Sequence, residues 1–239
     1  MWDKPQLMLW LANLLYAMAA LLLLYAVLFL TVHLPVFPLR EVKVNGELRH
    51  VTREQVQFIV SRELKGNFFT LDLNRTRKGF EKLPWVRKVN VRRRWPDRLE
   101  VSLEEHEVLA RWGTMALVNT HGELFRAASD KALPVFVGPA ESAQEVTQRY
   151  IAFKRQFEPL RLRPVQVSLS PRRAWQIKLD SGLVVELGRE QVEVRLEKFV
   201  RVYDRTLGRL GRQVNYVDLR YPNGFAVRMP EGGAKPAGA

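Results

Sequence analysis

Hydrophobic residues are most concentrated near the start of the chain, where residues 7–32 read LMLWLANLLYAMAALLLLYAVLFLTV without a charge. A helix of this length reaches about 39 Å at 1.5 Å per residue, and the hydrocarbon core of a bilayer is about 30 Å thick. Such a helix satisfies its own backbone hydrogen bonds in lipid, which a loop or a lone strand cannot do. The run therefore predicts a transmembrane helix over residues 7–32, after a short amino end at residues 1–6.

Two other interpretations of this run are weaker. Ala17-Met18-Ala19 has the small-x-small form of a signal-peptide cleavage site, but it lies in the middle of a run that is longer than the usual apolar core of about 7–15 residues. A buried helix of a soluble protein seldom stays free of charge over such a length. The flanking charges leave the sidedness open, because more basic residues follow the run than precede it, whereas long following domains translocate largely regardless of charge.

Residues 37–105 change between strand-like and helix-like periods. Alternating apolar residues predict strands at Val42 and Val44, at Val89 and Val91, and at Leu99, Val101 and Leu103. Between the first two strands, a capping box at residues 52–55 opens one helix, and Asn74 is expected to cap a second helix that runs to Leu83. Residues 68–71 are expected to be extended. The order β-α-α-β-β predicts a small domain.

Residues 106–229 have the pattern of a mixed sheet with helices packed against it. Two amphipathic helices are predicted, one over residues 141–157 and a longer one over residues 192–210. Short apolar strands separated by turn residues make up the remainder, and the last of them are expected at 214–221 and 225–229. Residues 230–239 are rich in Gly, Ala and Pro and are expected to be disordered. The predicted fold class is α+β, with one membrane helix ahead of two domains.

The chain is strongly basic, with a formal net charge of +13, and it contains no cysteine. A basic balance points to nucleic acid, anionic lipid or acidic partners. The segment 92–95, Arg-Arg-Arg-Trp, could bind nucleic acid through charge and stacking, or it could be a strand with basic outward side chains; export of the domain would favour the second interpretation. Arg172 and Arg173, ahead of Trp175, fit a protein-partner surface better, because Arg and Trp are enriched at interaction hot spots.

No catalytic constellation is found in the sequence. The P-loop, the G-x-S-x-G elbow and the G-x-G-x-x-G fingerprint are all absent. The absence of cysteine excludes thiolate zinc ligands and cysteine nucleophiles. No two histidines show the spacing of a zinc helix; they are His33, His50, His106 and His121. The sequence therefore predicts no catalytic residue, no metal site and no cofactor site.

The carboxyl end of the second predicted domain suggests a free sheet edge. The strong strand pattern at 214–221 is followed by only one short strand, so that unpaired N–H and C=O groups are expected there. Such an edge could accept a strand from another protein. It could equally be blunted by its own charges, Arg220 and Arg228.

Two segments carry a resemblance to a known family. Residues 83–101 read LPWVRKVNVRRRWPDRLEV, and residues 216–221 read YVDLRY near the end of the second predicted domain. Together with the membrane helix and the β-α-α-β-β order, these segments resemble the FtsQ/DivIB family of bacterial division proteins, whose first domain after the membrane is a polypeptide-transport-associated (POTRA) module. The similarity extends from the membrane helix to about Met229.

The resemblance implies a fold, a location and a role. It implies a POTRA domain at 37–105 and a C-terminal β domain at 106–229, in a single-pass inner-membrane protein with a cytoplasmic N-terminus and its bulk in the periplasm, at the division septum. It also implies a scaffold without enzymatic activity, cofactor, small-molecule substrate or nucleic acid. Members of the family join the division proteins FtsB and FtsL, and FtsK, FtsW and FtsI are further partners that the resemblance suggests.

The resemblance also implies a partner-binding surface on the last strands of the second domain. By position it includes Arg220, Tyr221, Gly224 and Phe225, with Arg172 on the neighbouring surface. The alternative is a POTRA-containing subunit of an outer-membrane assembly or secretion system. Such proteins usually carry several POTRA modules or a barrel of many alternating strands, and only one module is visible in this sequence.

Overall fold

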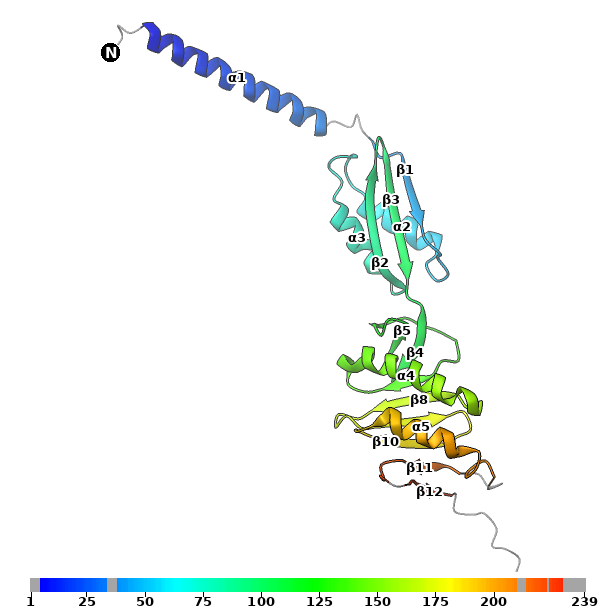
Figure 1. Cartoon of the computed structure of the whole chain (residues 1–239). Coiled ribbons are helices and arrows are strands. Elements are labelled where there is room, and N and C mark those ends of the chain that lie inside the picture. The colour runs from blue at the N-terminus through cyan, green and yellow to red at the C-terminus, as the bar shows by residue number, and fades with distance from the viewer. Residues whose placement is uncertain (1–4, 34–37, 210–213, 223, 230–239) are drawn as a thin grey trace, which may run out of the picture. The chain divides into compact units, whose positions relative to one another are not determined.

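The computed structural model describes residues 5–33, 38–209, 214–222 and 224–229. The chain divides into two compact units, Met1–Glu105 and His106–Ala239 (Figure 1). Each unit has its own cluster of buried hydrophobic side chains. The fold is α+β with an N-terminal apolar helix, as the sequence predicts.

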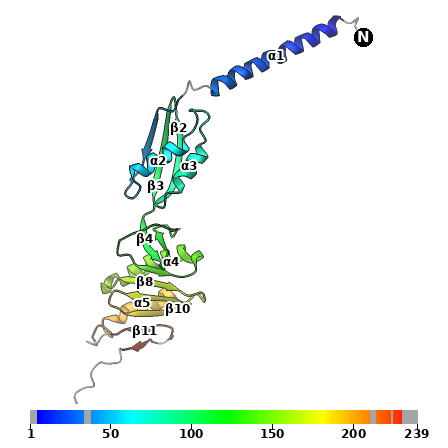
Figure 2. The ribbon, with the colours of Figure 1, turned by 180° about the vertical axis from the view of Figure 1, so that it is seen from behind.

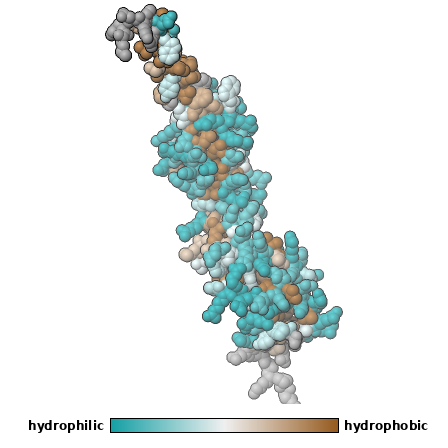
Figure 3. All heavy atoms as spheres, turned by 60° about the vertical axis from the view of Figure 1, so that its left-hand side comes forward, coloured by the Kyte–Doolittle hydropathy of each residue, from teal (hydrophilic) through white to brown (hydrophobic). Residues whose placement is uncertain are grey.

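The first helix, α1 (Pro5–His33), is continuous over its whole length. Its stretch from Met8 to Val32 is long and apolar enough to cross a membrane, and none of that stretch is buried within the protein. Figure 3 shows brown, hydrophobic side chains on this helix, whereas teal, hydrophilic residues cover most of the surface of the two units seen from that side. A continuous apolar helix at the predicted position is thereby confirmed, with a length and composition that fit a membrane span.

A three-stranded sheet covered by two helices follows α1 in the first unit. Its elements, in chain order, are β1 (Glu41–Asn45), α2 (Arg53–Glu63), α3 (Leu73–Glu81), β2 (Val86–Arg94) and β3 (Arg98–Glu105). The strands lie in the order β1-β3-β2, with β1 parallel and β2 antiparallel to the central β3. The predicted β-α-α-β-β order is confirmed.

Alternation of side chains along these strands places the core on the helical face of the sheet. Leu99 and Val101 of β3 are fully buried and pack with Phe80 of α3. The capping box of α2 is present, because the Thr52 side chain accepts from the backbone N–H of Gln55 while the Gln55 side chain accepts from that of Thr52. These two reciprocal bonds fix the start of α2 through its local sequence.

Two local predictions in this unit are wrong. The N-cap of α3 is Asp72, whose carboxylate accepts from the backbone N–H groups of Asn74 and Arg75, so Asn74 lies inside the helix. Residues 68–70 form a turn, not an extended segment. The cause is the side-chain oxygen of Asn67, which accepts from the backbone N–H groups two and three residues later and closes the turn locally.

A mixed nine-stranded sheet forms the body of the second unit. Its strands are β4 (Val108–Trp112), β5 (Ala116–Asn119), β6 (Leu124–Phe125), β7 (Val135–Val137), β8 (Pro164–Leu169), β9 (Trp175–Leu179), β10 (Val184–Gly188), β11 (Tyr216–Asp218) and β12 (Ala226–Arg228). They lie in the order β12-β11-β10-β9-β8-β7-β4-β5-β6. Helices α4 (Ala143–Phe157) and α5 (Val192–Tyr203) pack on β8 and β10 respectively, and an ion pair between Arg149 and Glu193 joins them (Figures 1 and 2).

The core of the second unit lies between these helices and the sheet. The predicted amphipathic character of α4 is confirmed, since Val146, Tyr150, Phe153 and Phe157 on one face of the helix are all buried. Two lengths are overestimated from the sequence. The helix predicted over 192–210 ends at Tyr203, and turns follow it; the strand predicted over 214–221 is limited to three residues. Residues 210–213 and the predicted tail at 230–239 lie outside the described residues.

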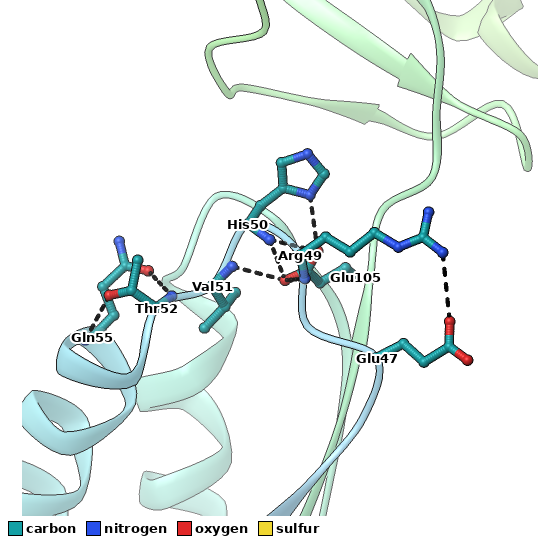
Figure 4. A network of polar contacts seen from close by, with 7 residues as sticks. All are labelled: Glu47, Arg49, His50, Val51, Thr52, Gln55 and Glu105. Carbon is teal, nitrogen blue, oxygen red and sulfur yellow. Dashed lines mark hydrogen bonds and ion pairs between the residues drawn. The ribbon is translucent and has the colours of Figure 1, made fainter.

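The two units meet in the chain at adjacent residues, and each residue is fixed within its own unit. The carboxylate of Glu105 accepts from the backbone N–H groups of Arg49 (3.2 Å), His50 (3.0 Å) and Val51 (2.8 Å) (Figure 4). One Glu105 oxygen also lies 2.9 Å from His50 Nδ1. On the other side, His106 stacks on Phe125 with ring centroids 4.1 Å apart. Glu105 and His106 are therefore each held by contacts within their own unit.

Electrostatics explain why Glu105 remains charged in this position. Burial alone would raise the pKa of the Glu105 carboxyl, but the hydrogen bonds from His50 and from the backbone of Val51, His50 and Arg49 outweigh burial and lower that pKa. The His50 ring in turn stacks on Trp85, with centroids 3.7 Å apart. The ionised carboxylate thus holds the segment between β1 and α2 in place.

The substitution Glu105→Gln should destabilise the first unit by about 1–3 kcal/mol, because an amide cannot satisfy all of these donors. In the parent protein this stabilisation is present above the unfolded pKa of about 4.3 and is lost as the pH falls through the lower pKa of the folded state. Urea unfolding of the detergent-solubilised protein, monitored by hydrogen exchange of the β3 amides, measures the loss of stability in the variant. The same measurement on the parent at a series of pH values gives the pH dependence.

The matched control for this measurement is Glu104→Gln, one residue earlier on the same strand. The Glu104 side chain is 51% exposed and pairs with Arg87 at the surface. Its replacement should change the free energy of unfolding by less than about 1 kcal/mol. Equal losses in the two variants would contradict the role given to Glu105.

Candidate partner-binding surface

The last strand of the second unit, β12, lies at the edge of the sheet. It pairs antiparallel with β11 in the register Tyr216↔Arg228, Val217↔Val227 and Asp218↔Ala226. All three β12 residues are exposed. Within the described ranges, no strand pairs with the outer side of β12. Its backbone groups on that side are therefore available to another chain.

An ion pair fixes the chain where it leaves β11. The Nε and Nη2 atoms of Arg220 donate to the two carboxylate oxygens of Asp218 at 2.9 and 2.7 Å, and the backbone N–H of Arg220 donates to Oδ1 at 3.0 Å. The hydrogen bonds from the Arg220 side chain are the largest cause that lowers the pKa of Asp218. Burial of the Asp218 side chain alone would raise its pKa, but the bonds from Arg220 outweigh burial, so the contact stays charged and holds the start of the loop to β12.

The Arg220 side chain lies over Gly188, the last residue of β10. A Cβ added at Gly188 would lie 3.0 Å from Cγ of Arg220 and 3.0 Å from Nη1 of Arg195. The same Arg195 atom donates to the carbonyl oxygen of Leu187 at 2.8 Å. Gly188 also has a φ of +75°, a conformation that favours glycine. The side chains of Arg195 and Arg220 can therefore pack across the end of β10, because Gly188 has no side chain to block them.

A groove of about 770 Å³ lies between α5 and the segment that joins β11 to β12. Phe199 of α5, Leu219 and Phe225 contribute to its apolar lining. The rings of Phe199 and Phe225 meet edge to face, with centroids 5.7 Å apart. This contact ties the segment before β12 to α5, so that the groove and the free edge form one surface.

Basic side chains dominate the charge around the groove. Arg195, Lys198 and Arg201 of α5 line it, against the single carboxylate of Glu190. Arg201 is also paired with Glu197 on the same helix at 2.8 Å. Because such surface pairs are weak, the cations can still attract an acidic group that enters the groove.

The structure brings four of the five predicted partner-binding residues together. Arg220, Tyr221, Gly224 and Phe225 all lie on the connection from β11 to β12, and the last three line the groove. Tyr221 is 56% exposed, Phe225 is half-buried, and a Cβ added at Gly224 would meet nothing within 4 Å. The surface thus offers an aromatic ring and an open stretch of backbone side by side.

Arg172, the fifth predicted residue, lies apart from these four. It is exposed in the turn between β8 and β9. The register pairs Trp175 of β9 with Gly188 of β10, and β10 runs parallel to β11. Arg172 and Arg220 therefore lie at the same end of the sheet, with β10 between their strands, and neither of them lines the groove.

The sequence did not identify the contribution of α5 to this surface. The amphipathic pattern predicts one apolar and one polar face for this helix, but not that Phe199 and the cations would line a groove with the segment after β11. No sequence signal shows that the loop after β11 comes back to that helix. In the part of the chain that the structure describes, no three His, Asp or Glu side chains converge as a metal site would require.

Comparison with known families decides what kind of protein carries this surface. Residues 110–220 match the family described as "Cell division protein FtsQ/DivIB, C-terminal", and residues 37–106 match the family described as "POTRA domain, FtsQ-type". The chain belongs to the FtsQ/DivIB family. The resemblance of the two sequence segments to this family is confirmed, and with it a role in cell division.

Relatives of the FtsQ/DivIB family are similar over almost the full length. "Cell division protein FtsQ" of Nitrosospira multiformis is 48% identical over 233 residues, which cover 95% of this chain and 99% of that protein. The protein of the same name from Burkholderia pseudomallei is 43% identical, with 95% of this chain and 94% of that protein covered. The one from Neisseria gonorrhoeae is 33% identical and covers 97% of both chains.

Gly188→Ala should destabilise the second unit, because the left-handed backbone conformation costs an alanine about 1–2 kcal/mol and the new Cβ would also displace the Arg220 side chain. The control is Gly182→Ala, since Gly182 has a φ of +87° but open space around it. Hydrogen exchange of β10 amides in the intact protein measures both losses. A loss at Gly182 equal to that at Gly188 would contradict the close contact with Arg220.

Proposed function

We propose that this protein is a non-enzymatic scaffold of the division machinery, which binds FtsB and FtsL and links them to other septal proteins, with FtsK, FtsW and FtsI as further contacts. Through these contacts it would help control septal cell-wall synthesis. The observation that supports this proposal best is the free edge of β12 beside a basic, aromatic groove, in a chain of the FtsQ/DivIB family.

The proposed contact is strand addition. A segment of FtsB would pair with the outer side of β12, and its backbone would satisfy the edge groups that β11 does not reach. Gly224 leaves room for the partner to approach the backbone closely. Side chains at alternate positions of the added strand would point to one face, where an apolar one could contact Tyr221 and Phe225.

The charge of the groove specifies the chemistry of that partner. Arg195 and Lys198 lie against one carboxylate, and Arg220 keeps more than half of its side chain exposed despite its pair with Asp218. An acidic or amphipathic segment would therefore bind better than a neutral one, and its association would weaken as salt increases. Arg172 would add to the attraction from the neighbouring turn.

The proposed location follows from α1 and from family membership. We propose residues 1–6 as a cytoplasmic end, 7–32 as a single inner-membrane span, 37–105 as the POTRA domain and 106–229 as the periplasmic β domain, with residues 230–239 as a disordered tail. The protein would gather at the septum. A subunit of an outer-membrane assembly or secretion system, the alternative from the sequence, is disfavoured by the family match.

Tyr221→Ala should weaken binding of a soluble FtsB segment by about 2 kcal/mol or more, roughly thirtyfold, because aromatic side chains dominate the energy of such contacts. The exposed ring contributes little to the core, so the fold should be retained. Isothermal titration of the full-length protein in detergent measures the change in affinity. Met115→Ala, at an 82% exposed residue in another turn of the same unit, is the control and should bind as the parent does.

A modified partner tests the strand itself. An FtsB peptide with N-methyl groups on alternate backbone amides keeps its side chains but loses its ability to extend a sheet. It should bind far more weakly than the unmodified peptide if its blocked amides face β12. Equal affinity of peptides methylated in either alternation would contradict strand addition while leaving a side-chain contact at Tyr221 possible.

Protease treatment of spheroplasts should digest the protein beyond residue 37, because that part is proposed to lie outside the cytoplasm. An antibody against the membrane-proximal end of the chain follows the shortened product. A cytoplasmic marker protein must remain intact in the same sample. Protection of the second unit until the cells are lysed would contradict the proposed orientation.

A further inference from the structure

Among the described tryptophans of the first unit, Trp95 is the most exposed, although tryptophan is usually well buried. It stands at the turn between β2 and β3 and is 80% exposed. The ring therefore presents a large apolar surface with one N–H donor to whatever lies outside this turn. Amphipathic rings of this kind are typical of the boundary between water and membrane.

The same end of the unit carries the chain that arrives from α1. The backbone N–H of Arg40, just before β1, donates to the carbonyl oxygen of Asp97 in the Trp95 turn at 3.0 Å. Six residues, 34–39, separate α1 from this anchored point, and the seven Cα–Cα steps from His33 to Arg40 span at most about 25 Å. The turn therefore cannot lie far from the membrane end of α1.

A second exposed aromatic side chain belongs to this end. Arg93 donates through Nε to the carbonyl oxygen of Phe68 at 2.7 Å and through Nη2 to that of Phe69 at 3.3 Å. These bonds tie the turn between α2 and α3 to the last residues of β2. Phe69 is 43% exposed there. Arg93 thus faces the helices and supports this turn. The sequence places it in a run of outward basic side chains, and the structure shows that Arg93 does not belong to such a patch.

The end of the sheet beside the Trp95 turn carries more basic than acidic residues. The strand registers place there the basic residues Lys43, Arg92, Arg94 and Arg98, with Arg40 just before β1, and the acidic residues Glu41, Asp97 and Glu100. Arg98 pairs with Glu41 at 3.0 Å and Arg94 with Glu100 at 3.1 Å, yet both guanidinium groups are largely exposed. Since a guanidinium has five N–H donors, each pair leaves donors for a phosphate oxygen.

We propose that this hairpin end, defined by Phe69, Arg92, Arg94, Trp95 and Arg98, docks on the anionic bilayer surface in which α1 is anchored. The Trp95 ring lies at the level of the headgroups, and the arginines bind lipid phosphates. The proposal rests on α1 spanning the membrane, which is part of the proposed function, but it does not depend on partner binding. An anionic bilayer would bind both the exposed aromatic side chains and the positive charge. The short segment between α1 and Arg40 keeps that surface within reach.

Trp95 emission in the full-length protein tests this docking. The spectrum of Trp95→Phe is subtracted from that of the parent, in vesicles of phosphatidylglycerol and phosphatidylcholine, so that the difference reports Trp95 alone. The difference spectrum should be shifted to shorter wavelength, and lipids brominated on the acyl chains should quench it. In pure phosphatidylcholine, or at high salt, where the Debye length falls from about 8 Å toward about 3 Å, the shift should be lost.

Two variants control this experiment. Met115→Trp, made in the Trp95→Phe background, places a tryptophan at an exposed turn of the second unit, where emission should match that of a water-exposed ring. Arg92→Glu with Arg94→Glu should abolish the shift of Trp95 while far-UV circular dichroism shows a retained fold. Affinity for FtsB in the same variant should be unchanged, which separates this proposal from the partner site.

The proposal is overturned if Trp95 in anionic vesicles behaves as the tryptophan at position 115 does. It is also overturned if the shift is equal in anionic and neutral vesicles, because the arginines would then have no part in it. A shift that appears only after another protein or a nucleic acid is added would identify a macromolecular ligand of this end in place of lipid.

Discussion

Every backbone N–H and C=O group removed from water needs a hydrogen-bond partner, and this requirement shapes the protein from one end to the other. In α1 each group finds its partner within the same helix, which allows the segment to stand in lipid. In the two sheets the groups are paired between neighbouring strands, and this pairing stops at the outer side of each edge strand. β12 is one of these edge strands, and the proposed function depends on another chain completing the pairing there.

Periodicity in the sequence predicts most of the fold because burial in this chain follows regular faces. The stripe on α4 and the alternation along β3 are seen directly in the residue pattern. Errors arise where a side chain competes with the regular backbone. Asn67 closes a turn where extended backbone was expected, and Asp72 caps α3 two residues before the predicted cap. Such local hydrogen bonds depend on single side chains and leave no periodic pattern in the sequence.

The candidate surface was predictable in part. The edge at the carboxyl end follows from the strand pattern, and Tyr221 and its neighbours were identified through the family resemblance. The groove was not, because it requires Phe199 to meet Phe225 across a connection that no pattern records. The position of Arg220 over Gly188 likewise depends on the register of β10 and β11, which is a property of the folded sheet.

β12 is only three residues long and carries Arg228, and both properties affect whether two copies of the protein can pair edge to edge. A three-residue edge strand offers few backbone hydrogen bonds to an added strand, so the charge of the side chains decides whether pairing is favourable. A second copy would bring its own Arg228 and its own cationic groove against those of the first, and like charges face to face oppose such pairing. Homotypic sheet growth is thereby discouraged, while the same edge stays open to a different chain of opposite charge.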